Sequence, residues 1–244
     1  MGRKMCENRC SCGRVPRKKW LGYGARAVAV LLCIAVLPAG VLAQDVAITD
    51  GKITASVTLG GETLLITRNQ DSEAILTGEF ARTSRACPPY CIQPMQVVRS
   101  VATIAELEVI AFLETEVSTG KGLLIDARLP ELFSTGSIPG AVNVPFATLA
   151  AENPYQMDIL AVLGGKPVAG GGIDFEAAVD LVIFCNGPWS DQSAQAVRSL
   201  REAGYPADKL RYYRGGLQDW QMLGLTMTAA TTELAGIQTA GVTP

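Results

Sequence analysis

Residues 181–191 read Leu181-Val182-Ile183-Phe184-Cys185-Asn186-Gly187-Pro188-Trp189-Ser190-Asp191. The four apolar residues before Cys185 predict a short buried strand, because branched and aromatic side chains are enriched in such strands. Gly187 and Pro188 then force a turn, and apolar residues recur at helical spacing over residues 192–203. Cys185 is therefore expected in a loop between a buried strand and the start of a helix.

The position of Cys185 supports two interpretations. The start of a helix carries unpaired N–H groups and a partial positive charge, which favour a thiolate and can hold an anion. On this interpretation Cys185 is a candidate nucleophile. The alternative is a small buried apolar side chain at a strand end, since free cysteine is among the most buried residue types.

The chain contains no histidine. This excludes catalysis by Ser–His or Cys–His pairs, histidine metal sites and imidazole proton shuttles. If Cys185 is activated, the activation has to come from backbone dipoles or nearby charges. We expect no cofactor and no metal.

Residues 1–43 have the pattern of a signal peptide. A basic stretch precedes an apolar run over residues 27–37, and Pro38 is followed by small residues up to Ala43 that suit cleavage. We expect a periplasmic or otherwise exported protein whose mature chain starts near Gln44. The apolar run is shorter than the roughly 20 residues of a membrane span, so membrane contact is expected only if the signal stays uncleaved.

The charge of the mature chain argues against nucleic acid as a partner. Residues 1–43 hold eight of the 21 basic residues and one of the 23 acidic residues, so the remainder carries a net charge of about −9. A surface of that sign repels phosphate backbones and anionic lipid. The sequence gives no indication of the oligomeric state.

Three of the seven cysteines lie after the predicted signal: Cys87, Cys91 and Cys185. An odd number in an oxidising compartment predicts one pair and one free thiol. Cys87 and Cys91 are close enough in sequence to pair with each other. Such a disulfide is either a clip that fixes an irregular segment or a redox-active pair, and the sequence leaves both open.

Residues 44–100 predict a β-rich extension. Apolar and polar residues alternate over 53–59 and 63–66, with a Gly-Gly pair between them, which is typical of a hairpin. A further short run at 46–48 suggests a third strand, and so a small β-meander. Residues 70–98 show no sustained period and predict a connector that contains Cys87 and Cys91.

Residues 101–228 alternate between strand and helix patterns. The expected elements are a helix opened by a capping box from Thr103 to Glu106, a strand at 123–126, a helix at 155–163, the strand at 181–184, a helix at 192–203, a strand at 210–213 and a helix through 220–223. This alternation predicts an α/β fold, with a parallel sheet flanked by helices and a ligand site at the carboxyl ends of the strands, where Cys185 lies. Residues 229–244 predict a flexible tail.

Three segments of this α/β region resemble the rhodanese family. They are Asp126-Ala127-Arg128 followed by Gly136-Ser137-Ile138-Pro139-Gly140-Ala141, Cys185 in its strand-to-helix loop, and Tyr213-Arg214-Gly215-Gly216-Leu217-Gln218-Asp219-Trp220. Their order and spacing agree with the family over about residues 101–228, so the α/β region is identified as a rhodanese-like domain.

The resemblance implies a sulfurtransferase in which Cys185 carries a sulfane sulfur as a persulfide. It implies a small sulfur-containing donor and a thiol or protein acceptor as partners. The loop residues implied to surround the sulfur are Asn186, Gly187, Pro188, Trp189 and Ser190. Asp126 and Arg128 would be structural, with their charges paired.

The chain departs from the family pattern at several positions. Ser137 stands where the family has a histidine, and the loop contains no Lys or Arg to bind an anionic donor. Asp191 stands where related phosphatases have an arginine, so phosphoryl transfer is not expected. Arg82 and Arg85, in the connector, are candidate contacts for an anionic donor.

Two other functions stay open at this point. The domain could be a non-catalytic rhodanese-fold binding module, or a thiol–disulfide protein that uses Cys87 and Cys91. Two loop residues also have two interpretations each: Trp189 as a pocket wall or a packing lid, and Ser190 as a persulfide ligand or a helix cap. Trp220 is predicted to lie in the core.

Overall fold

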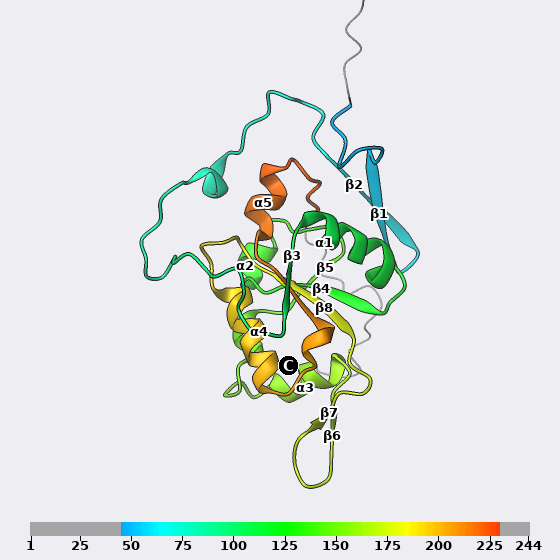
Figure 1. Ribbon diagram of the computed structural model, residues 1–244, viewed down its shortest axis with the longest axis vertical. Helices are drawn as coiled ribbons and strands as arrows, with labels where there is room; N and C mark the ends of the chain where they lie inside the picture. The colour runs from blue at the N-terminus through cyan, green and yellow to red at the C-terminus, as the bar shows by residue number, and fades with distance from the viewer. Residues whose placement is uncertain (1–44, 230–244) are drawn as a thin grey trace, which may run out of the picture. The chain divides into compact units, whose positions relative to one another are not determined.

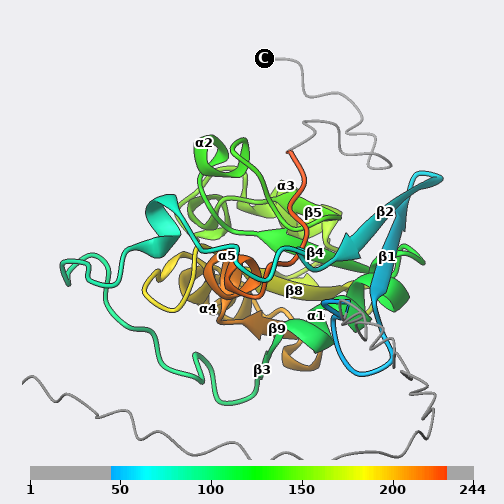
Figure 2. The same ribbon diagram turned by 90° about the horizontal axis from the view of Figure 1, so that it is seen from above.

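The computed structural model describes residues 45–229 (Figure 1; Figure 2). The predicted signal peptide at 1–43, and all of the predicted tail except residue 229, lie outside this range.

A parallel sheet of five strands forms the centre of the fold (Figure 1). In spatial order the strands are β3 (Ala102–Ile104), β9 (Leu210–Tyr213), β8 (Asp180–Phe184), β4 (Gly122–Asp126) and β5 (Ala141–Asn143). Every neighbouring pair is parallel, so the carboxyl ends of β4, β8 and β9 meet at one edge of the sheet. The predicted α/β fold is confirmed.

Helices cover both faces of the sheet, because alternate residues of each strand point to opposite faces. Val182 and Phe184 of β8 belong to a core cluster with α1 and α5, whereas Leu181 and Ile183 belong to a second cluster with α3 and α4. The helices are α1 (Glu106–Phe112), which continues into a π-helical turn (Leu113–Val117), α2 (Pro130–Phe133), α3 (Gln156–Val162), α4 (Gln192–Glu202) and α5 (Gly216–Met222). Trp220 of α5 is fully buried, as predicted.

The remaining elements are short. They are an antiparallel pair of two-residue strands, β6 (Lys166–Pro167) and β7 (Ile173–Asp174), and 3₁₀ turns at Gly78–Ala81, Phe146–Leu149 and Ala207–Lys209.

The N-terminal extension contains two strands rather than three. β1 (Thr54–Leu59) and β2 (Glu62–Thr67) form an antiparallel hairpin that lies beside α1 (Figure 1; Figure 2). The predicted strand at 46–48 is absent, because the chain turns at Thr49, which makes only an isolated bridge to Lys52. Val57 and Ile66 of the hairpin are fully buried in the cluster that contains α1 and α5.

The predicted capping box at Thr103 is wrong. Thr103 lies in β3, where it pairs with Tyr212 of β9, and its hydroxyl donates to the carbonyl of Met95. The helix starts later, and Glu108 accepts a hydrogen bond from the N–H of Ala105 at 3.0 Å. Tertiary pairing of residues 102–104 with β9 therefore overrides the local helix signal.

No helix within residues 45–229 has the length and hydrophobicity that a bilayer span requires.

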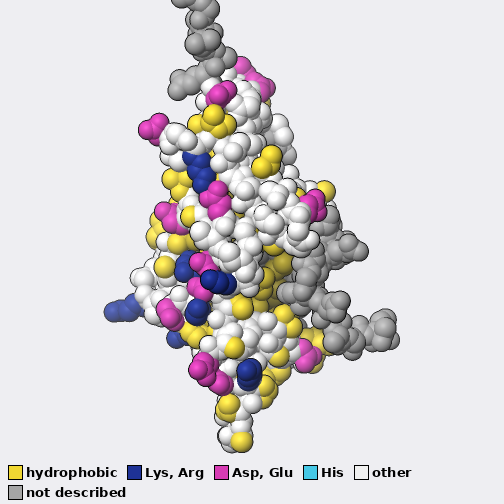
Figure 3. Space-filling model, turned by 90° about the vertical axis from the view of Figure 1, so that its right-hand side faces the viewer, with side chains coloured by type: hydrophobic (Ala, Val, Ile, Leu, Met, Phe, Trp, Pro, Cys, Tyr) yellow, Lys and Arg dark blue, Asp and Glu magenta, His cyan; other side chains and the backbone are white. Residues whose placement is uncertain are grey.

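On the face shown in Figure 3, acidic and basic side chains are interspersed and do not form separate patches of one sign.

A charge cluster at the start of β8 predicts acid sensitivity. Lys209 and Arg211 donate to the Asp180 carboxylate at 2.8 and 3.0 Å. Burial alone would raise the pKa of Asp180, but these two cations outweigh it and lower the pKa below its ordinary value of 3.8. The ion cluster thus contributes stability above pH 3.8, and that contribution is lost as the pH falls through the lowered pKa.

Urea unfolding between pH 2 and pH 7 tests this contribution. We expect Asp180→Asn to lower the unfolding free energy at neutral pH and to flatten its fall in acid, with Asp158→Asn, on an exposed face of α3, as the control. An unchanged pH profile in Asp180→Asn would contradict the prediction.

Candidate active site

Cys185 follows β8 directly and holds its thiol at the start of α4. The residue is 2% exposed and is the free cysteine among residues 45–229. Its Sγ lies 2.8 Å from the hydroxyl of Ser193, in the first turn of α4, and 3.6 Å from the carbonyl of Ser190. The expected placement at a strand-to-helix loop is confirmed.

The start of α5 fixes the backbone of the Cys185 loop. The N–H of Leu217 donates to the Cys185 carbonyl at 3.0 Å, and the N–H of Gln218 donates to the Asn186 carbonyl at 2.9 Å. Gly216 makes this approach possible, because its φ is +56° and an added Cβ would lie 2.4 Å from the Cys185 carbonyl oxygen. The Gly-Gly motif therefore serves the loop as well as the helix.

Within the loop, some N–H groups are used and others stay available. The N–H of Ser190 donates to the Gly187 carbonyl at 3.0 Å and closes a turn. Among the residues that the structure describes, the N–H groups of Gly187 and Trp189 donate to no protein acceptor. Pro188 has no N–H, so the loop offers fewer donors than its length suggests.

The loop side chains are tied to α4. The amide of Asn186 donates to Oε1 of Gln192 at 3.2 Å, and the Ser190 hydroxyl lies 3.5 Å from the same oxygen. The residue before α4 is Asp191, whose side chain makes no capping bond to the helix backbone and accepts instead from Gln195 at 2.7 Å. Ser190 does not occupy the cap position.

Two residues near the thiol were missed by the sequence analysis: Ser193 and Tyr212. Tyr212 pairs with Ile183 across β9 and β8, which places its side chain on the face that Cys185 shares. Within the described part of the chain, its buried hydroxyl has no hydrogen-bond partner of standard geometry. Burial, and then the charge of a Cys185 thiolate, raise the pKa of Tyr212 to about 12. In the sequence, Tyr212 is marked only by its place in the predicted strand at 210–213, and the pairing of that strand with β8 comes from the structure.

We expect Ser193→Ala to slow the reaction of Cys185 with iodoacetamide at a fixed pH. The hydroxyl is in place to donate to the sulfur anion, and a hydrogen bond to a charged group contributes about 1.5–3 kcal/mol, so the rate should fall by about tenfold or more. Ser199→Ala, on the same helix, is the matched control. Equal rates in both variants would show that Ser193 does not support the anion.

Asp126 and Arg128 form a buried ion pair at the end of β4. Arg128 donates to the carboxylate from Nε at 2.9 and 3.0 Å and from Nη2 at 2.7 Å, and Nη2 also donates to the Gly136 carbonyl. Ser137, at the position of the family's histidine, donates to the same carboxylate at 2.7 Å. The pair holds together the segment that joins β4 to β5, and it makes no contact with the thiol.

The connector reaches the Cys185 loop. Cys87 and Cys91 are joined by a disulfide, as their spacing predicted. Arg85 stacks on the ring of Trp189 at 3.7 Å, and the N–H of Gln93 donates to the Pro188 carbonyl at 2.8 Å. The connector therefore contributes to the surroundings of the loop. Arg82 bonds Glu79, and it makes no hydrogen bond or ion pair with the loop residues that the structure describes.

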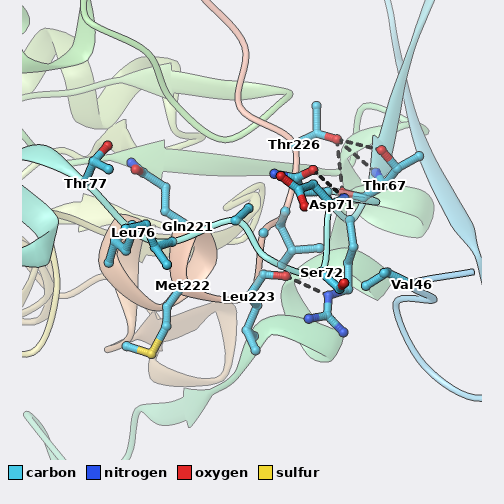
Figure 4. A pocket seen from close by; sticks show the side chains of 16 residues that line it. Val46, Thr67, Asp71, Ser72, Leu76, Thr77, Gln221, Met222, Leu223 and Thr226 are labelled. Carbon is cyan, nitrogen blue, oxygen red and sulfur yellow. Dashed lines mark hydrogen bonds between the residues drawn. The ribbon is translucent and has the colours of Figure 1, made fainter.

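A pocket of about 660 Å³ lies elsewhere, between the end of β2, the connector and the end of α5 (Figure 4). None of its lining residues belongs to the Cys185 loop. Its polar groups are largely paired with one another, for example Arg68 with the Leu223 carbonyl and Thr67 with Thr226. The chemistry of Cys185 is thus separate from this pocket.

Comparison with known proteins places this loop in a family. The sequence profile of the rhodanese-like domain matches residues 110–223. The human thiosulfate:glutathione sulfurtransferase is 30% identical over 108 residues, which span 44% of this chain and 86% of that enzyme. The chain belongs to the rhodanese family.

Two further similarities show the extent of the match. A helix-turn-helix-type transcriptional regulator of Mycobacterium tuberculosis is 33% identical over 106 residues, which span 43% of this chain but only 37% of the regulator. The solved structure of a human single-domain sulfurtransferase is 27% identical, with 50% of this chain and 96% of that chain covered and a TM-score of 0.34. The rhodanese domain includes Cys185 and the ion pair, whereas the connector lies before the matched range.

Proposed function

We propose that the protein is a sulfurtransferase that carries sulfane sulfur as a persulfide on Cys185. The observation that carries the proposal is the free thiol at the start of α4, in a rhodanese loop whose backbone is fixed by α5. A fixed loop suits this chemistry, because preorganised donors stabilise a sulfur anion without any rearrangement during the reaction. No histidine is needed for that role.

Thiosulfate illustrates the first step. The Cys185 thiolate attacks the outer sulfur of thiosulfate, a new S–S bond forms to Cys185, and the old S–S bond breaks. Its electron pair leaves with sulfite. The N–H groups of Gly187 and Trp189 and the Ser193 hydroxyl are the donors that we assign to the persulfide anion.

The second step returns the enzyme to its starting state. The persulfide anion takes a proton from water. An acceptor thiolate attacks its outer sulfur, and that sulfur leaves with its proton as the acceptor's persulfide. Cys185 departs as a thiolate. Glutathione is the first acceptor to try, because the human relative is named for it.

Turnover assays test the proposal. The full chain is supplied with thiosulfate, or separately with inorganic polysulfide, together with glutathione, and the glutathione persulfide formed is measured. We expect turnover with at least one donor in the wild type and none in Cys185→Ser. Turnover that survives in Cys185→Ser would contradict the proposal, and absence of turnover with both donors would favour a binding module.

We also propose that the domain acts after export. The basic stretch and apolar run of residues 1–43 support this, together with the disulfide between Cys87 and Cys91. N-terminal sequencing of the protein from its native cell is expected to start near Gln44. A start at Met1 would contradict cleavage.

A further inference from the structure

The part of the connector at residues 79–93, which we call the strap, lies against the outer side of the Cys185 loop. In that loop only Pro188 and Trp189 are half-buried, and the other residues from Cys185 to Ser190 are buried. The strap contacts these two residues. It precedes the residues that match the rhodanese-like domain.

Arg85 and Tyr90 hold the Trp189 ring from two directions. The Arg85 guanidinium lies 3.7 Å from the ring centroid, and the Tyr90 ring meets it edge-on at 5.6 Å with an angle of 76° between the planes. A cation on an aromatic face and an edge-on aromatic pair are both attractive contacts. Trp189 is therefore restrained by the strap and not by the loop alone.

The Arg85 side chain is unusually buried for a connector residue. It is 5% exposed, Nη1 donates to the Glu79 carboxylate and Nη2 donates to the Glu79 carbonyl. Its buried Nε has no hydrogen-bond partner in the described part of the chain. Stacking on Trp189 is the contact that accounts for burial of a charged group at this position.

Both ends of the strap are fastened to the domain. At its start, the Phe80 carbonyl accepts from the amide of Gln218, and Oε1 of the same amide accepts from the Trp189 indole N–H. At its end, Gln93 donates to the Pro188 carbonyl at 2.8 Å and accepts from Arg214 at 3.0 Å. These two attachments limit how far the chain between them can move from the loop.

The disulfide closes the strap at its Tyr90 contact with Trp189. Cys87 and Cys91 bracket a short turn that contains Tyr90, and Arg85 lies two residues before this turn. A covalent link there reduces the number of conformations open to the turn, which restrains the Tyr90 ring beside the indole.

We propose that Arg85 and Tyr90 are specificity-determining residues, which hold Trp189 in place at the exposed side of the Cys185 loop. The restrained Trp189 ring admits small sulfur donors to Cys185 and excludes bulky ones. The Cys87–Cys91 disulfide maintains this arrangement. The inference rests on the proposed function for its meaning, but access to Cys185 is measurable whether or not a persulfide forms.

Alkylation of Cys185 by reagents of two sizes tests the inference. The full chain is treated with iodoacetamide or with a fluorescein maleimide, and modification of the Cys185 peptide is followed by mass mapping. Loss of one aromatic contact changes a rate by up to about tenfold, which corresponds to about 1.4 kcal/mol. We expect Tyr90→Ala and the double variant Cys87→Ser, Cys91→Ser to raise the maleimide rate by about that factor and to change the iodoacetamide rate by less than about twofold.

Matched variants identify the route of the effect. Tyr90→Phe keeps the ring and should behave as the wild type, and Arg85→Lys should retain more selectivity than Arg85→Gln, because it retains a cation at the ring. In a Trp189→Ala background, Tyr90→Ala should have no further effect, since its action passes through Trp189.

Two outcomes overturn the inference. One is a maleimide-to-iodoacetamide ratio that is the same in the wild type and in all the strap variants. The other is a parallel rise of both rates, which would show general opening of the fold. Failure of the proposed function has a different signature, namely absence of sulfur transfer in a wild type whose alkylation ratio still responds to the strap variants.

Discussion

Gly216→Ala is expected to displace the Cys185 loop and to abolish sulfur transfer. The new Cβ would lie 2.4 Å from the Cys185 carbonyl oxygen and 2.8 Å from the Gly187 nitrogen. Both are backbone atoms, so the loop itself has to move. The move breaks the two hydrogen bonds that Leu217 and Gln218 donate to it.

The expected loss of stability combines two effects. A positive φ costs a side chain about 1–2 kcal/mol, and overpacking costs about 1–3 kcal/mol more. Urea unfolding measures the sum, and the alkylation rate of Cys185 measures the loop. Gly120→Ala is the control for the first effect, because Gly120 has a φ of +70° with no atom within 4 Å of an added Cβ. If Gly216→Ala changes the unfolding free energy and the alkylation rate no more than Gly120→Ala does, α5 does not fix the loop.

Arg128→Met is expected to have the second large effect, and to act on stability. It leaves the Asp126 carboxylate fully buried, and within residues 45–229 its remaining hydrogen-bond donors are the Ser137 hydroxyl and the backbone N–H of residue 128. Breaking one partner out of a buried ion pair costs about 3–5 kcal/mol. Urea unfolding should show a loss of that size.

A double variant distinguishes loss of the whole ion pair from loss of one of its two charges. Asp126→Leu with Arg128→Met removes both charges, and we expect it to be less destabilised than the sum of the two single variants. The folded protein should still alkylate at Cys185 at the normal rate, because the pair does not touch the thiol. Strict additivity, or a slowed alkylation rate, would contradict a purely structural role.

The sequence carried enough local information for the elements that position Cys185. β4, β8 and β9 are apolar runs with clear ends, and α4 has a helical period over 11 residues. β3 and β5 have three residues each, which is too short for a pattern, and only their partners in the sheet define them. The strand expected at 46–48 did not form, because the chain turns at Thr49 and no described strand pairs with these residues.

The surroundings of the thiol were less predictable. Tyr212 and Ser193 reach Cys185 through strand register and through the first turn of a helix, and neither relation is visible in a motif. The pairing of Cys87 with Cys91 followed from their spacing, but the packing of residues 79–93 on Trp189 depends on side-chain contacts across more than 90 residues of sequence. An irregular segment has no period from which to infer such contacts.

The intact mass of the full chain after incubation with a sulfur donor shows whether Cys185 carries a persulfide. Wild type and Cys185→Ser are incubated with thiosulfate or with polysulfide and separated from the donor, and their intact masses are measured. We expect a gain of one sulfur atom in the wild type alone, reversed by an acceptor thiol. A wild type that gains no sulfur from either donor, while Cys185 still reacts with iodoacetamide, would show that Cys185 is not a persulfide carrier for these donors.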